Sequence, residues 1–171
     1  IPKSAAITAH VAISPKITES NNPFVSRVVT TLVNTNEPLA KWAAESVGKK
    51  IAIVADTSDY GVANVKAFTD FYTAAGGSIV ATETAPVGTT DFRAILTKIK
   101  GTSPDAVYFG GVVTEAALVR KQMVELGLNT PMIGVDGFHD PEFIKIAGAA
   151  ADGTISGVAK EQGNPKLEKM Q

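Results

Sequence analysis

The sequence predicts an α/β fold in which a parallel sheet is flanked by helices. From Gly48 onward, short apolar runs rich in β-branched residues alternate with amphipathic stretches of helical period. The runs recur at the spacing of one strand and one helix, which is typical of parallel strands joined by helical crossovers. The 171 residues, 44% of them apolar, are enough for the core of one domain.

Five apolar runs account for the strands of this sheet. They are IAIVAD (51–56), SIVATE (78–83), DAVYFGG (105–111), PMIGVD (131–136) and GTISGVA (153–159). The regular spacing of the first four indicates strands of a parallel sheet more strongly than any single run does. The fifth run is short and follows the apolar stretch AGAAA, so we expect it at an edge of the sheet.

Helix-start and helix-stop residues separate these runs. Candidate N-caps are Asn36, with Pro38 in the first turn after it, then Thr114 and Asp140. The spacing of the apolar residues places Trp42 on the core side of the first helix and Val62 on the apolar stripe of the second. We therefore expect a helix before the first strand and one between each pair of consecutive strands.

The two ends of the chain do not follow this rhythm. The stretch AAITAHVAISP could form one strand, and the polar stretch after it is extended and interrupted by prolines. We divide the chain into a crossing segment (1–35), an α/β lobe (36–159) and a polar tail (160–171). Because the chain lacks an initiating methionine and ends in polar residues, we expect it to be a fragment or a processed product.

The charge balance argues against nucleic acid and anionic membranes as partners. Sixteen basic and seventeen acidic residues are scattered along the chain, so no strong basic field arises. No apolar run approaches the roughly 20 residues that span a bilayer. We therefore expect a globular chain whose partner is neither of these two.

The sequence offers little to a catalytic or metal site. The two histidines, His10 and His139, lie far apart, cysteine is absent, and no GxSxG, GxGxxG or phosphate-loop motif occurs. Asp56 and Asp59 could pair as acid and base, bind a cation, or serve as ordinary loop carboxylates. We expect no catalytic residue, no metal and no cofactor, and we do not expect an enzyme.

One rim of the predicted sheet carries the functional chemistry. In an open parallel sheet, ligands bind outside the carboxyl ends of the strands, where the strand order reverses. The loops at those ends are Asp56 to Tyr60, Gly110 to Glu115 and Asp136 to His139, and all carry polar or aromatic groups. The opposite loops consist mainly of turn formers and helix caps. The sequence therefore predicts a binding site at the carboxyl edge.

Tyr60 and Asp136 are the candidate binding residues of this rim. A tyrosine offers a rigid apolar face with a hydroxyl tip, and a carboxylate can accept a charge-assisted hydrogen bond from an ammonium group. An aromatic or aliphatic amino acid would use both groups. The competing interpretations are that Tyr60 only begins a helix and that Asp136 only belongs to an Asp-Gly turn.

The order of several motifs resembles a known family. FVSRVVTT, PLAKWAAESVGKKIAIVADTSDYG, AFTDFYTAAGGSIV, TTDFRAILTKIKGTSPDAVYFGG and GVDG together resemble the type I periplasmic binding proteins that serve ABC importers of branched-chain amino acids and related compounds. The resemblance implies two Rossmann-like lobes that trap a ligand as they close. This chain is similar to the crossing segment and most of the second lobe, with the bulk of the first lobe absent.

The resemblance also implies roles for single residues. Tyr60 corresponds to a tyrosine that packs over the ligand, and Asp136 to an acidic residue that takes the α-amino group. Val112 stands where relatives place a wall residue, often aromatic, and an aliphatic side chain there argues against simple leucine specificity. In AISPKITES, either Ser14 or Thr18 corresponds to a hydroxyl that bonds the ligand.

The function that the resemblance implies is solute binding for an ABC importer. The ligand would be an amino acid or a related carboxylate or aromatic compound, delivered to a membrane permease. The expected location is periplasmic, or extracytoplasmic on a lipid anchor in a Gram-positive source. A ligand-sensing domain of a regulator or receptor with the same fold is the alternative. We also expect the isolated lobe to bind weakly and copies of it to associate.

Overall fold

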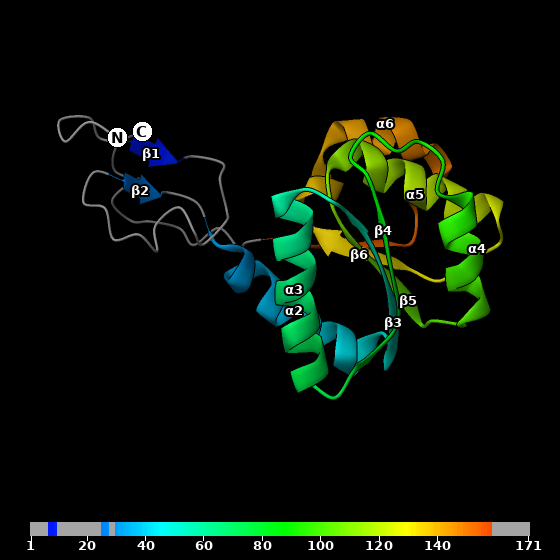
Figure 1. Ribbon diagram of the computed structural model, residues 1–171, viewed down its shortest axis with the longest axis horizontal. Helices are drawn as coiled ribbons and strands as arrows, with labels where there is room; N and C mark the ends of the chain where they lie inside the picture. Colours follow the sequence, from blue (N-terminus) through cyan, green and yellow to red (C-terminus); the bar gives the residue numbers. More distant parts are fainter. Residues whose placement is uncertain (1–6, 10–24, 28–29, 159–171) are drawn as a thin grey trace.

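The computed structural model describes residues 7–9, 25–27 and 30–158, and its main feature is a five-stranded parallel sheet. The strand order is β4-β3-β5-β6-β7 (Figure 1). The strands are β3 (Lys50–Asp56), β4 (Ser78–Ala85), β5 (Ala106–Gly110), β6 (Met132–Val135) and β7 (Thr154–Gly157). All five predicted strands are therefore confirmed, including the last one at an edge.

Helices cover both faces of this sheet. They are α2 (Leu32–Ser46), α3 (Asp59–Ala74), α4 (Arg93–Gly101), α5 (Val113–Glu125) and α6 (Pro141–Ala147), with short 3-10 helices η1 (Asp136–His139) and η2 (Gly148–Ala151). Helices α2 and α3 pack on one face, and α4, α5 and α6 pack on the other (Figure 1). The predicted α/β class is confirmed.

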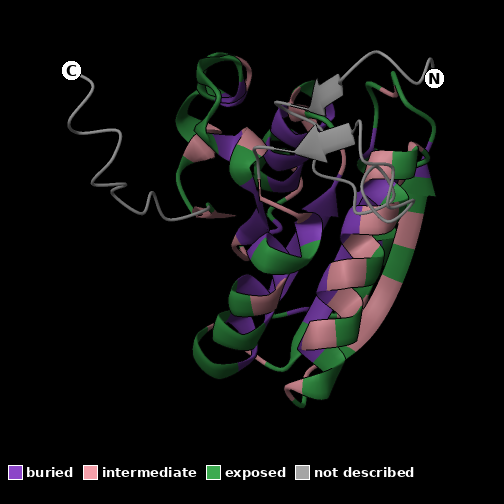
Figure 2. Cartoon of the chain, turned by 90° about the vertical axis from the view of Figure 1, so that its left-hand side faces the viewer, coloured by how far each residue is buried: buried purple, intermediate pink, exposed green. Residues whose placement is uncertain are grey.

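The alternation of side chains along β3 creates a core on each face. Ile51 and Ile53 pack toward α2 and α3, whereas Ala52 and Val54 pack toward α4 and α5. All four are buried, because a strand in the middle of a two-faced sheet exposes neither side. Figure 2 shows the buried residues in the sheet and on the inner helix faces, with exposed residues outside.

The chain reverses direction across the sheet between β3 and β5. From β3 it moves outward to β4 and then returns past β3 to β5, β6 and β7. A switch of this kind leaves a crevice at the carboxyl ends of the two central strands, since their helices lie on opposite faces. The loops after β3 and β5 therefore meet at one point of the rim.

The described residues near the N-terminus form a separate two-stranded sheet. Strand β1 (Ile7–Ala9) pairs in parallel with β2 (Val25–Arg27). A strand was predicted in the region of β1, whereas β2 was not predicted. The division of the chain at residues 35 and 159 stays a prediction. No helix among the described residues is long and apolar enough to cross a membrane.

Two predicted helix starts are wrong. Helix α2 is capped by Thr31, whose side chain accepts a hydrogen bond from the Asn34 amide at 3.2 Å, and Asn36 lies buried inside the helix. Helix α5 begins at Val113, one residue before the expected Thr114 cap. The predicted Asp140 cap is confirmed, because the Asp140 side chain accepts a hydrogen bond from the Glu142 amide of α6 at 2.8 Å.

Two apolar side chains assigned to the core point outward. Trp42 is 42% exposed and lines a surface groove between α2 and β7, because Leu39 and its small neighbours already fill the space above the sheet. Val62 is 58% exposed near the start of α3, where the buried positions belong to Gly61 and Asn64. The spacing of apolar residues along one helix does not show which of them fill the space between that helix and the sheet.

Candidate functional site

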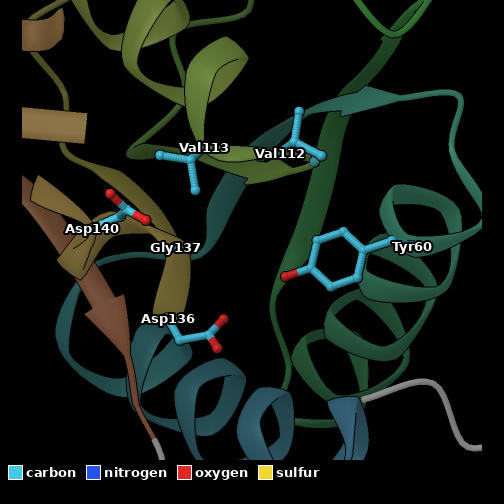
Figure 3. A pocket seen from close by; sticks show the side chains of 7 residues that line it. Tyr60, Val112, Val113, Asp136, Gly137 and Asp140 are labelled. Carbon is cyan, nitrogen blue, oxygen red and sulfur yellow. The ribbon is translucent and has the colours of Figure 1, made fainter. Parts of the chain in front are cut away.

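A pocket of about 440 Å³ lies at the carboxyl edge of the sheet. The loops after β3, β5 and β6 each contribute to it, as the switch in strand order predicts (Figure 3). Its lining residues are Tyr60, Gly111, Val112, Val113, Asp136, Gly137 and Asp140. The structure thus brings together Tyr60, Asp136 and Val112, three of the residues predicted from the sequence.

Tyr60 forms one wall of the pocket. It is the second residue of α3, which is capped by Ser58: the Ser58 hydroxyl accepts from the Gly61 amide at 2.9 Å. The ring packs against the core on the α2 and α3 side, and its hydroxyl points into the pocket on the side of Asp136 (Figure 3). Burial is the main cause that raises the pKa of Tyr60 to about 12, and the nearby charges of Asp136 and Asp56 add to it. At neutral pH the Tyr60 side chain is therefore a neutral phenol that can donate a hydrogen bond.

Asp136 faces Tyr60 from the other side of the pocket. It is the first residue of η1, directly after the last residue of β6, and its side chain is exposed. Within the part of the chain that the structure describes, no hydrogen bond or ion pair engages its carboxylate. Asp140 also lines the pocket, but its side chain caps α6. Asp136 is therefore the carboxylate that is free to meet a cationic group.

Val112 and Val113 supply the apolar side of the pocket. Both lie between β5 and the first turn of α5, and Val112 is 39% exposed. Figure 3 shows their side chains on the wall beside Tyr60 and Asp140. The pocket therefore combines an aromatic face, two branched aliphatic groups and a carboxylate, which suits a small amphiphilic ligand.

Asp56 joins the loops on either side of the switch point. One carboxylate oxygen accepts from the Ser58 amide at 2.9 Å and from the Ser58 hydroxyl, and the other accepts from the Val112 amide at 3.0 Å. Asp56 is only 2% exposed, whereas Asp59 is exposed in the first turn of α3. Of the interpretations left open for this pair, the geometry favours a loop-shaping carboxylate for Asp56.

Two glycines allow this close approach. A Cβ atom on Gly61 would lie 2.2 Å from an Asp56 carboxylate oxygen and 2.8 Å from the Gly110 carbonyl oxygen. A Cβ atom on Gly111 would lie 2.6 Å from the second Asp56 oxygen. Both positions require glycine for space, so the stretch from Asp56 to Gly61 is built around one buried carboxylate.

Among the remaining candidate residues, only His139 is described by the structure, and it does not line this pocket. Ser14 and Thr18 lie outside the described residues, and His139 is exposed. Among the described residues, no group of three His, Asp or Glu side chains is placed to hold a metal ion. The sequence reasoning did not name Val113 or Asp140 as lining residues, although both directly follow predicted rim loops or lie within them.

The structure shows an α/β fold with a pocket at the carboxyl edge of its sheet, and the chain is similar to known binding proteins. A family model for periplasmic binding proteins matches residues 6–170. The Leu/Ile/Val-binding protein BraC3 of Rhizobium johnstonii is 34% identical over 145 residues, which are 84% of this chain and 40% of the relative.

Two solved structures share the fold and carry different ligands. The branched-chain amino acid transporter substrate-binding protein LivJ from Streptococcus pneumoniae, in complex with isoleucine, is 28% identical with a TM-score of 0.72, covering 88% of this chain and 44% of that one. A solute-binding protein of an ABC transporter from Rhodopseudomonas palustris, in complex with 3,4-dihydroxybenzoic acid, is 27% identical with a TM-score of 0.69, covering 79% and 38%.

The chain belongs to the periplasmic binding protein family, since the family model covers nearly all of it. It is a type I periplasmic binding protein of the branched-chain amino acid ABC transporter type, as the resemblance in the sequence implied. Its matches span between 29% and 40% of the length of these curated relatives.

Proposed function

We propose that this chain is the second lobe and crossing segment of the solute-binding component of an ABC importer. The ligand is an amino acid or a related compound held in the cleft between this lobe and a first lobe. The observation that carries the proposal is the carboxylate of Asp136, which has no partner among the described residues, opposite the neutral phenol of Tyr60 in a pocket at the switch point of the sheet. Family membership supports the same role.

The pocket's charge favours a ligand that carries an amine. Among the described residues, its lining includes two carboxylates, Asp136 and Asp140, and no lysine, arginine or histidine. A ligand whose only charge is a carboxylate would meet like charges here, whereas an ammonium group gains a charge-assisted hydrogen bond from Asp136. We therefore favour an amino acid over an aromatic acid, although relatives of both kinds exist.

Each wall of the pocket has a distinct role in this proposal. Asp136 takes the α-amino group, the Tyr60 ring covers the ligand, and Val112 lies against its side chain. Because no cationic side chain lines the described pocket, we expect the other lobe to supply most of the contacts to the ligand's carboxylate. The hydroxyl of Ser14 or Thr18, in the crossing segment, is a further candidate contact.

Binding would act by shifting a population of open and closed forms. A ligand held by both lobes stabilises the closed form, which then docks on a permease at the outer face of the membrane.

This lobe alone supplies only half of the contacts, so the isolated chain should bind weakly and its exposed surfaces should favour association. Sedimentation of the isolated chain as a clean monomer at high concentration would count against that association.

A thermal-shift screen of the longer protein that carries this chain tests the function. Leucine, isoleucine, valine and phenylalanine should raise the melting temperature, since a ligand that binds only the folded state stabilises it. The variant Asp136→Asn should lose most of the shift. Asp59→Asn is the matched control: Asp59 is exposed in the first turn of α3 and is not among the residues that line the pocket, so the shift should persist. If no amine-bearing compound raises the melting temperature, the role of Asp136 is wrong.

A further inference from the structure

Three polar side chains meet inside the apolar layer between the sheet and helices α2 and α3. Asn36 of α2, Asn64 of α3 and Tyr108 of β5 are all fully buried. The Asn36 amide nitrogen donates to the Asn64 carbonyl oxygen at 2.7 Å and to the Leu32 backbone at 3.0 Å. The Tyr108 hydroxyl lies 2.7 Å from the Asn36 carbonyl oxygen and 3.0 Å from that of Asn64.

This network is a poor device for stability alone. Buried polar groups lose their bonds to water, and a network is favourable only when every member finds a partner. The side-chain amide nitrogen of Asn64 has no partner among the described residues. In addition, the single proton of the Tyr108 hydroxyl cannot serve both carbonyl oxygens at once. An apolar layer would avoid these costs, so the network calls for another explanation.

The network lies directly behind the pocket. Asn64 is one helical turn after Tyr60, so the two share one side of α3. Tyr108 is two residues before the end of β5, which leads to Val112. The Tyr60 ring packs against the same core cluster that contains Tyr108. In Figure 1, α2 and α3 lie next to each other on this face of the sheet.

We propose that Asn36, Asn64 and Tyr108 are positioning residues for the Tyr60 wall of the pocket. Apolar side chains tolerate sliding and rotation, whereas hydrogen bonds between three elements allow one register. The network thereby holds the first turn of α3 at one depth and rotation against β5 and α2. Because Tyr60 belongs to that turn, the position of its ring depends on the position of the turn. The consequence for affinity rests on the function proposed above, but the consequence for the position of Tyr60 does not.

The chain offers a matched pair of variants for the test. Tyr108 and Tyr72 both stack on Phe68, with ring centroids 3.8 and 5.4 Å away, and both are fully buried. The Tyr72 hydroxyl donates to the Gly48 carbonyl at 2.8 Å, at the far end of α3 from the pocket. Tyr108→Phe therefore removes a hydroxyl that contacts α3 near its start, through Asn64, and Tyr72→Phe removes the same group near the end of α3.

The readout is local and needs no ligand. The chain has three tyrosines, so carbon-13 labelling of tyrosine gives three ring signals that Tyr→Phe variants assign. In the folded 171-residue chain, Tyr108→Phe should shift the Tyr60 ring signal and speed amide exchange in the first turn of α3. Tyr72→Phe should leave both unchanged and instead speed exchange in the last turn.

Two results would overturn the proposal. One is an unchanged Tyr60 signal and unchanged first-turn exchange in Tyr108→Phe; the other is an equal response in Tyr72→Phe. If Tyr108→Phe does not fold, Asn64→Ala takes its place with the same expected outcomes. In the longer protein, Tyr108→Phe should weaken amino-acid binding more than Tyr72→Phe does. If no amino acid binds at all, the proposed function fails while the signal of Tyr60 still decides the positioning role.

Discussion

Replacing Asp56 by asparagine should destabilise the chain far more than the same change at Asp59. Both carboxylates belong to the loop between β3 and α3, but only Asp56 is buried, with donors on both of its oxygens. Asparagine keeps one oxygen and turns the other into an NH₂ group. That group would face either the Ser58 or the Val112 amide, so donor would meet donor.

The expected loss follows from the bonds that change. A hydrogen bond to a charged group contributes about 1.5–3 kcal/mol, and leaving a buried amide without an acceptor adds to the loss. We expect Asp56→Asn to lower the free energy of unfolding by about 3 kcal/mol. Asp59 is exposed and interacts with the helix N-terminus, so Asp59→Asn should cost less than about 1 kcal/mol.

Urea unfolding of the 171-residue chain measures both values. Far-ultraviolet circular dichroism follows the helices, and Trp42, the single tryptophan, gives an independent fluorescence signal. Comparing the two variants cancels the change from carboxylate to amide and leaves the difference in environment. Equal losses in Asp56→Asn and Asp59→Asn would refute the assignment of Asp56 as the carboxylate that joins the two loops.

Three further predictions test the packing around the site. Gly61→Ala should cost about 2–3 kcal/mol because its Cβ would lie 2.2 Å from an Asp56 oxygen, whereas Gly101→Ala, with no atom within 4 Å, should not destabilise; urea midpoints compare them. Arg120→Met should cost at least about 3 kcal/mol by the same assay, because the buried guanidinium donates to three backbone carbonyls before β6 and β7. Burial raises the pKa of Tyr60 from 10.0 to about 12, so the folded chain keeps a proton that the unfolded chain loses there. Stability should therefore fall as pH rises through that window, and less steeply in Tyr60→Phe; identical slopes would contradict the shift.

The strands and the edge of the sheet that bears the pocket could be predicted because both depend on short-range patterns. The apolar runs and their spacing indicated parallel strands, and the switch-point rule then selected the loops that carry Tyr60 and Asp136. The sequence thus predicts that Tyr60 and Asp136, which follow two different strands, lie on one rim of the sheet, and both line the pocket there.

The contacts that shape the pocket could not be predicted because they join distant parts of the chain. The partner of Asp56 lies 56 residues away at Val112, and Asn36 meets Tyr108 across 72 residues. Glu115 lies in the first turn of α5, where an exposed carboxylate would be ordinary, yet it is buried and accepts from the Gly88 amide at 2.8 Å. Asparagine is common at helix N-caps, so the sequence alone does not distinguish a cap from a buried residue such as Asn36, which contacts Tyr108.

The most direct test of the central claim is calorimetric titration with a matched pair of ligands. L-isoleucine and its 2-hydroxy acid differ only in the amine that Asp136 is proposed to bind. In the longer protein that carries this chain, we predict that the amino acid binds at least about tenfold more tightly, and that Asp136→Asn removes this preference. Equal affinities for the two ligands, or a preference that survives Asp136→Asn, would contradict the account.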